Sequence, residues 1–206
     1  MTETDVQNLL KHNPNEMIDI ETGLTALAEL AKTAEKDRVS WAIVGGAAMY
    51  LYGSPRLTKD VDVIADKILS GIKSERPLGF GGERYQVQIK NKTVDVDWIV
   101  RNDEAKQIYQ AALQDAILME GIPVITTEWL IVLKYIAGRF KDQEDAVFLL
   151  RKKNLVSRKK IRANLKKVLG DNAWIFYRVG LQRWYDIADG VITTETEDYN
   201  PKARIE

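Results

Sequence analysis

The sequence predicts an α+β fold, in which a mixed β-sheet with flanking helices is followed by a C-terminal helical bundle. Short apolar or alternating runs between residues 39 and 100 predict strands, whereas apolar residues recur mostly at helical spacing after residue 103. The segment Lys90-Asn91-Lys92 suits a hairpin loop, so the strands on either side of it should be antiparallel neighbours. We therefore expect a core over 17–120, a helical region over 121–190, and flexible ends at 1–16 and 191–206.

The core should consist of one amphipathic helix followed by a sheet of about four strands. Apolar residues at helical spacing predict the helix over 21–36, and another helix is expected at 47–52, directly after a strand and Gly45-Gly46. Apolar runs or a period of two predict strands at 39–44, 60–64, 84–89 and 93–100.

The second half should be mostly helical. Residues 122–125 form a brief extended piece. Capping residues and helical periodicity predict helices at 103–113, 128–140, 141–153, 157–169 and 171–188.

Composition excludes several classes of site. The 206 residues include no cysteine, which rules out disulfides and thiolate metal ligands. The only histidine, His12, lies in the polar lead-in, so histidine acid–base catalysis is not expected. No apolar run approaches the roughly 20 residues of a membrane span, and we expect a soluble, cytoplasmic protein that does not enter a membrane.

A glycine pair stands between the first predicted strand and the following helix. Gly45 and Gly46 would let a ligand approach the main chain closely, and N–H groups at a helix start suit phosphate oxygens. We therefore regard both as candidate nucleotide-binding residues. The alternative is a glycine turn that only reverses the chain.

Two acidic pairs follow, each on a predicted strand. Asp60 and Asp62 lie two residues apart, so both carboxylates point to the same face, and a shared cation would relieve their repulsion. Mg²⁺ (or Mn²⁺) binds through such carboxylates together with substrate phosphates. The alternative is a strand that merely faces solvent.

Asp95 and Asp97 repeat this pattern on the last strand. If the two strands are neighbours, a third carboxylate reaches the same metal centre or takes the proton of an attacking hydroxyl. All four aspartates are candidate catalytic residues, and Asp60, Asp62 and Asp95 are the predicted metal ligands. Asp97 is the alternative to Asp95, because the two face the same side.

The segment Val44-Gly45-Gly46, thirteen residues, then Asp60-Val61-Asp62-Val63 resembles the signature of the nucleotidyltransferase superfamily related to DNA polymerase β. The residues Arg56, Thr58 and Lys59 are similar to those of AbiEii-type nucleotidyltransferases, many of which are toxins of toxin–antitoxin pairs. The resemblance implies a nucleotidyltransferase-like sheet, binding of a nucleotide such as ATP, and nucleotide contacts from Arg56, Thr58 and Lys59. It also implies that an antitoxin protein could be a partner.

The downstream segment from Pro123 to Leu150 resembles later helices of the same family. There a lysine and an aspartate serve the active site, which implies roles for Lys134 and for Asp145 or Asp142. Two alternatives need no catalysis: Lys134 could extend its ammonium group to solvent, and Asp142 could cap a helix.

The predicted function is metal-dependent transfer of a nucleoside monophosphate from an NTP to an acceptor hydroxyl on an RNA end, a protein or a small molecule. The segment 151–167 holds nine Lys or Arg residues and no acid, which suits an RNA acceptor such as tRNA, although it could be only a solvated face. Two other functions stay open: an inactive nucleotidyltransferase-fold binding or regulatory protein, and an RNA-binding module.

Overall fold

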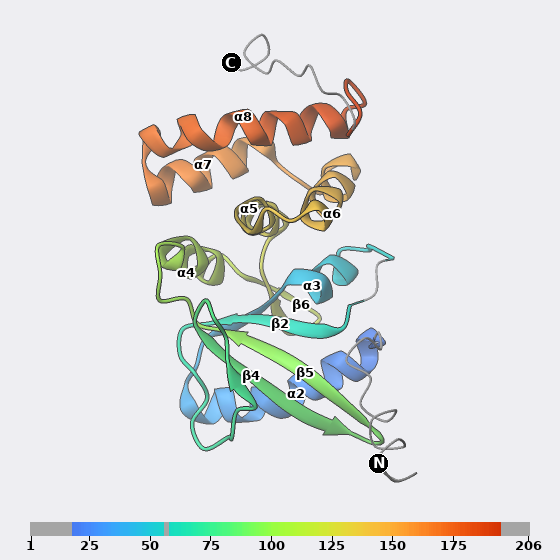
Figure 1. Cartoon of the computed structure of the whole chain (residues 1–206), viewed down its shortest axis with the longest axis vertical. Coiled ribbons are helices and arrows are strands. Elements are labelled where there is room, and N and C mark those ends of the chain that lie inside the picture. Colours follow the sequence, from blue (N-terminus) through green and yellow to red (C-terminus); the bar gives the residue numbers. More distant parts are fainter. Residues whose placement is uncertain (1–17, 56–57, 195–206) are drawn as a thin grey trace, which may run out of the picture. The chain divides into compact units, whose positions relative to one another are not determined.

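The computed structural model describes residues 18–55 and 58–194, which divide between Val124 and Ile125 into two compact units. We call them the sheet unit and the helical unit, and Figure 1 colours the chain from blue at its start to red at its end. The predicted flexible ends at 1–16 and 191–206 lie outside the described residues, except for 191–194, and so does Arg56. In the described part of the chain, no helix has the length and apolar character needed to cross a membrane.

The sheet unit is built on one mixed sheet, whose strands within the described residues follow the order β3-β4-β5-β2-β1-β7-β6. Strand β2 pairs antiparallel with β1 and parallel with β5, and the predicted hairpin joins β4 to β5. The strands are β1 (Trp41–Val44), β2 (Asp60–Ala65), β3 (Arg76–Pro77), β4 (Gly82–Ile89), β5 (Lys92–Ile99), β6 (Ile117–Met119) and β7 (Ile122–Val124).

The four predicted strands are confirmed, but the expected number of about four was too low, because the described residues form seven. The additional strands β3, β6 and β7 are only two or three residues long, and β7 lies within the segment 122–125 that was predicted to be extended. So short a segment shows no alternation, and only pairing with a neighbour makes it a strand.

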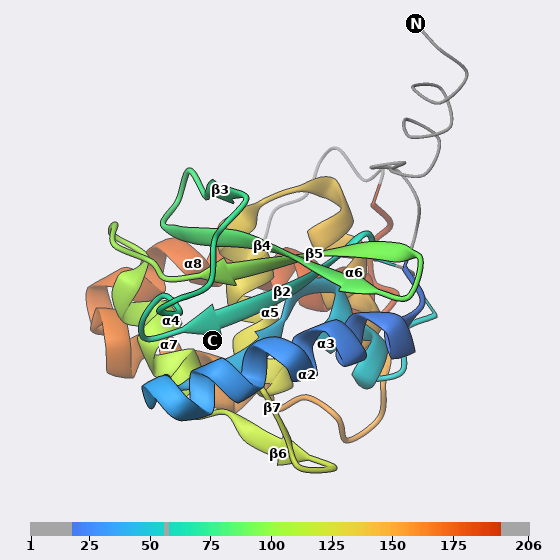
Figure 2. The same cartoon turned by 90° about the horizontal axis from the view of Figure 1, so that it is seen from below.

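The central strands have one apolar and one acidic face, because successive side chains point to opposite sides. Helix α2 (Ile20–Asp37) covers the apolar face, and a Cβ on its Gly23 would lie 3.0 Å from Cγ2 of Val61. Figures 1 and 2 show α2 along one side of the sheet and α3 (Gly45–Leu51) and α4 (Lys106–Gln114) along the other. The fully buried residues of the apolar face include Ile43, Val61, Val63, Tyr85, Val94, Val96 and Trp98.

The helical unit contains four helices among its described residues: α5 (Thr127–Ala137), α6 (Phe140–Arg151), α7 (Arg158–Leu169) and α8 (Asp171–Ala188). Helix α5 packs on α6 and α7, and α8 packs on the same two helices. The predicted helix over 128–140 ends earlier, because Gly138 takes the left-handed conformation (φ 66°) that separates α5 from α6.

Candidate active site

Carboxylates from two adjacent strands meet on the acidic face of the sheet. In the parallel pairing of β2 with β5, Asp60 lies beside Asp95 and Asp62 lies beside Asp97. Asp60, Asp62 and Asp97 each offer one oxygen, and these three oxygens lie within 4.8 Å of one another. Such a set of hard oxygen donors fits Mg²⁺ or Mn²⁺. Asp95, the predicted third ligand, lies outside this group, so the geometry favours its alternative, Asp97.

The glycine pair lies directly against this site. Gly45 has φ 64°, and a Cβ added to it would lie 1.9 Å from Oδ2 of Asp62. A Cβ on Gly46 would lie 2.5 Å from Oγ1 of Thr58. Both glycines are therefore required so that the backbone at the start of α3 can approach Asp62 and Thr58.

A guanidinium group lies among the carboxylates. Arg84 on β4 donates from Nε to Oδ1 of Asp97 at 2.6 Å and from Nη2 to Oδ2 of Asp97 at 2.8 Å. Its Nη1 donates to Oδ2 of Asp95 at 3.0 Å, and Nη2 lies 3.4 Å from Oδ2 of Asp60. The hydrogen bonds to Asp97 outweigh partial burial and, with the other carboxylates, raise the pKa of Arg84 above its usual value.

Arg84 was missing from the predicted site, although its position could have been found. The hairpin loop pairs Ile89 with Lys92, and this register puts Arg84 directly opposite Asp97. Residues directly opposite each other in an antiparallel pair point to the same face. Counting back from the predicted loop would therefore have brought the arginine to the acidic face.

Of the three residues before β2 that were predicted to contact the nucleotide, the structure describes Thr58 and Lys59. Thr58 is buried, and its hydroxyl donates to the backbone oxygen of Asp60 at 3.0 Å. Its Oγ1 also lies 3.4 Å from Oδ1 of Asp60, which holds the hydroxyl beside the carboxylate cluster. Lys59 is exposed. The nucleotide contacts expected of Thr58 and Lys59 stay predictions, as does that of Arg56.

Lys134 belongs to a second ion cluster, inside the helical unit. Its Nζ donates to Oδ2 of Asp145 at 2.5 Å and to Oδ1 of Asp142 at 3.3 Å. All three side chains are buried, and they join α5 to α6. The alternative in which Lys134 extends to solvent is therefore wrong.

Asp142 also organises the start of α6. Its Oδ2 accepts hydrogen bonds from the backbone N–H of Arg139 at 3.3 Å and from the Nε of Arg139 at 2.7 Å. Burial opposes ionisation of this carboxyl group, but Arg139 and Lys134 outweigh it and lower the pKa of Asp142. The helix-capping alternative for Asp142 thus fits the structure, whereas catalytic roles for Lys134 and Asp145 stay predictions.

The basic segment is partly neutralised within the helical unit. Arg158 forms a two-bond ion pair with Asp189 at 2.6 and 2.9 Å, and Lys166 pairs with Asp171 at 2.5 Å. Arg162 lies over the ring of Trp174, with 5.6 Å between the guanidinium carbon and the ring centroid. The positive charge that could meet an RNA backbone is therefore smaller than the sequence suggests.

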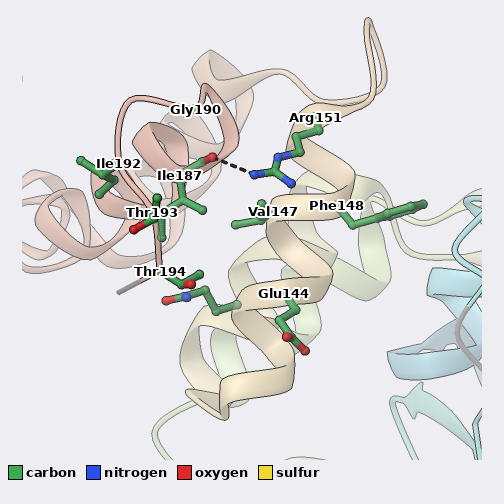
Figure 3. A pocket seen from close by; sticks show the side chains of 10 residues that line it. Glu144, Val147, Phe148, Arg151, Ile187, Gly190, Ile192, Thr193 and Thr194 are labelled. Carbon is green, nitrogen blue, oxygen red and sulfur yellow. Dashed lines mark hydrogen bonds between the residues drawn. The ribbon is translucent and has the colours of Figure 1, made fainter. Parts of the chain in front are cut away.

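A cavity of about 470 Å³ lies in the helical unit, between α6 and the segment that follows α8 (Figure 3). Arg151 at its edge donates from Nη2 to the backbone oxygen of Ile187 at 3.1 Å. Its lining mixes apolar, hydroxyl and charged groups, and the predicted site residues are not among them: Gln143, Glu144, Val147, Phe148, Arg151, Ile187, Gly190, Ile192, Thr193 and Thr194.

The sequence matches no protein-family model and no curated protein. Among solved structures, the chain is similar to an antigenic nucleotidyltransferase-like protein from Paracoccidioides brasiliensis, with 16% identity, a TM-score of 0.46, and coverage of 82% of this chain and 94% of that one. It is also similar to JHP933 from Helicobacter pylori, with 15% identity, a TM-score of 0.47, and coverage of 91% and 88%. At these TM-scores the likeness is remote, and the chemistry has to be inferred from the side chains of the site.

Proposed function

We propose that the chain is a metal-dependent nucleotidyltransferase, which moves a nucleoside monophosphate from an NTP to an acceptor hydroxyl and releases pyrophosphate. The observation that carries this proposal is the group of Asp60, Asp62 and Asp97, supplied by two parallel strands and set against Gly45. Three converging carboxylates can hold a metal ion, and the glycine turn beside them lets the backbone approach a phosphate group. Phosphoryl transfer depends on both a metal ion and phosphate positioning.

The carboxylates have distinct roles in this proposal. Asp60 and Asp62 hold Mg²⁺ or Mn²⁺, and Asp97, or Asp95 as predicted from the sequence, completes the site. The bound cation offsets the negative charge of the triphosphate. Asp97 also suits a proton acceptor for the attacking hydroxyl, because its carboxylate lies in the same cluster as both ligands.

The neighbouring residues bind the nucleotide. The backbone at Gly45 and Gly46 lies close to the triphosphate, while Arg56, Thr58 and Lys59 contact it from the segment before β2. The acceptor oxygen attacks the α-phosphorus, the bond from that phosphorus to the bridging oxygen breaks, and pyrophosphate leaves with its electron pair. Lys134 and Asp145 would serve this reaction only as the family resemblance implies.

The acceptor and the biological role are the finer part of the proposal. The resemblance of Arg56, Thr58 and Lys59 to AbiEii-type enzymes supports a toxin of a toxin–antitoxin pair, whose acceptor is an RNA end such as that of tRNA. A protein or small-molecule hydroxyl is the alternative acceptor.

The test is incorporation of labelled NMP from each NTP, with Mg²⁺ and total cell extract as the source of acceptors. The double variant Asp60→Asn, Asp62→Asn should lose metal-dependent labelling, whereas Glu104→Gln, which removes an exposed acid of the same unit, should keep it. Unchanged labelling by the double variant would refute the assignment. Binding of NTP and Mg²⁺ without transfer to any acceptor would instead favour the inactive binding protein.

A measurement of RNA binding distinguishes the proposed nucleotidyltransferase from the third candidate function, an RNA-binding module. An RNA-binding module should hold RNA with a steep salt dependence that survives loss of Asp60 and Asp62, and it should transfer nothing. A nucleotidyltransferase should lose transfer in that variant whether or not RNA still binds.

A further inference from the structure

The guanidinium of Arg84 holds positions that a divalent cation would need. It hydrogen-bonds to both oxygens of Asp97 and approaches Oδ2 of Asp60, and these are two of the three residues in the candidate metal group. The geometry of the bond to Asp97 is bidentate, the strong form of the arginine–carboxylate pair. The cluster in this structure therefore already has a cation, which belongs to the protein.

Charge explains why such a cation is present. Asp60, Asp62, Asp95 and Asp97 bring four negative charges to one face of the sheet, and Arg84 brings one positive charge. Like charges at this spacing repel one another, and an arginine held among them keeps the carboxylates together before a metal arrives.

We propose that Arg84 is the built-in counter-ion of the carboxylate site, which competes with the divalent cation for Asp97 and Asp60 and so weakens binding of the free metal. This inference rests on the metal site of the proposed function. A metal that binds Asp97 has to share or displace the guanidinium, and it meets the repulsion of a positive charge at contact distance. Arg84 acts on the metal through these ligands and is a positioning residue.

The first test measures binding of Mn²⁺ without nucleotide, by electron paramagnetic resonance of the free ion or by calorimetry. Arg84→Gln should bind Mn²⁺ about tenfold more tightly than the wild type, or more, because the competing charge is gone. Arg84→Lys keeps the charge and should stay close to the wild type. Equal or weaker Mn²⁺ binding by Arg84→Gln overturns the proposal.

Arg76→Gln is the matched control. Arg76 lies opposite Arg84 in the pairing of β3 with β4, it is half-exposed, and its partner is Glu75 at 3.4 Å. The same charge is thus removed one strand further from the carboxylates. Its Mn²⁺ affinity should stay within about twofold of the wild type, because charges separated in this way are screened by solvent and salt. A gain equal to that of Arg84→Gln would overturn the contact mechanism.

A second measurement uses the wild-type chain, in case Arg84→Gln does not fold. The Nε–H signal of Arg84 in a nitrogen-15 spectrum, assigned by its loss in Arg84→Lys, reports the bond to Asp97. Saturating Mg²⁺ should shift or broaden this signal, and the Asp60→Asn, Asp62→Asn variant should abolish the change. A signal that is unaltered by Mg²⁺ binding overturns the proposal.

The outcomes separate this inference from the proposed function. Metal-dependent transfer by the wild type, with equal Mn²⁺ affinity in Arg84→Gln, leaves the function standing and refutes the role of Arg84. Tighter Mn²⁺ binding by Arg84→Gln, with no transfer by any form, supports the role of Arg84 and refutes the function. Failure of both wild type and Arg84→Gln to bind Mn²⁺ overturns the inference together with the metal site.

Discussion

The two units each contain a basic side chain surrounded by aspartates, and the two clusters differ in charge balance and burial. Around Arg84, three carboxylates pair with one guanidinium, and the paired side chains are between 11% and 33% exposed. Around Lys134, two carboxylates are matched by Lys134 and Arg139, and the three central side chains are at most 6% exposed.

This difference in exposure supports the proposal of a ligand site at Arg84 and of a structural role for the cluster at Lys134. A buried cluster has to be neutral and fully hydrogen-bonded to be tolerated, and the group around Lys134 meets that requirement. The group around Arg84 lies where solvent and ions can reach it, which is typical of functional sites. We therefore expect substitutions in the carboxylate cluster around Arg84 to change metal binding and nucleotidyl transfer. Substitutions in the cluster around Lys134 should instead change the stability of the fold.

The largest expected effect is that of Gly45→Ala on the carboxylate site. A Cβ would lie 1.9 Å from Oδ2 of Asp62, so the carboxylate has to move away from its position beside Asp60. A displacement of about 1 Å in a catalytic group lowers rates by about a hundredfold or more. Incorporation of labelled NMP and affinity for Mn²⁺ should both fall.

Gly71→Ala is the control for Gly45→Ala. Gly71 has a similar φ of 72°, but a Cβ there meets no atom within 4 Å. This variant carries the same backbone strain without the contact, so it should lower the free energy of unfolding by about 1–2 kcal/mol and leave NMP incorporation unchanged. Equal activity losses in the two variants would mean that strain, and not the contact with Asp62, explains the effect.

The next largest effect is that of Lys134→Met on stability. The substitution leaves Asp145 buried without its cation, and breaking a buried pair from one side costs about 3–5 kcal/mol. Urea unfolding should therefore show a large fall in the free energy of unfolding. Lys166→Met, which removes a cation from a pair with the exposed Asp171, should have a much smaller effect.

The result for Lys134 also tests the family resemblance. A fall in kcat with an unchanged free energy of unfolding would contradict the structural role and assign Lys134 to the reaction. A fall in stability with normal kcat for the folded fraction would leave the reaction to the sheet unit.

Much of the fold could be predicted because its elements are long enough to show a period. The strands β2 and β5 alternate acid and apolar residues, and α7 and α8 were predicted to within a residue of their observed ends. The strand β6 could not be predicted, because its three residues depend on pairing with β7 and carry no pattern of their own.

The sequence predicts the site residues that lie two apart on one strand and so share a face. It does not predict the choices that depend on how separate strands or helices pair. Asp60 and Asp62 follow from the period of a strand, but the choice between Asp95 and Asp97 depends on the register between β2 and β5, which no local pattern contains. Arg84 needed the hairpin register as well. The pairing of Lys134 with both Asp142 and Asp145 depends on how α5 turns into α6 at Gly138.

The smallest expected effect concerns the pH dependence of the helical unit. Because the pKa of Asp142 is lowered in the folded chain, its contribution to stability is complete above the unfolded value of about 3.9 and is lost as the pH falls through the folded value. Asp142→Asn should thus lower the free energy of unfolding by about 1.5–3 kcal/mol near pH 7, the range for hydrogen bonds to charged groups. Urea unfolding between pH 3 and pH 7 should show this difference from the wild type as constant down to about pH 4 and smaller below it.

The same measurement on Asp103→Asn, whose ion pair with Arg101 lies at the surface, should show a much weaker pH effect. A wild-type advantage that grows on acidification would contradict the lowered pKa, and it would indicate that Asp142 is buried as a neutral acid, outside the balanced cluster around Lys134.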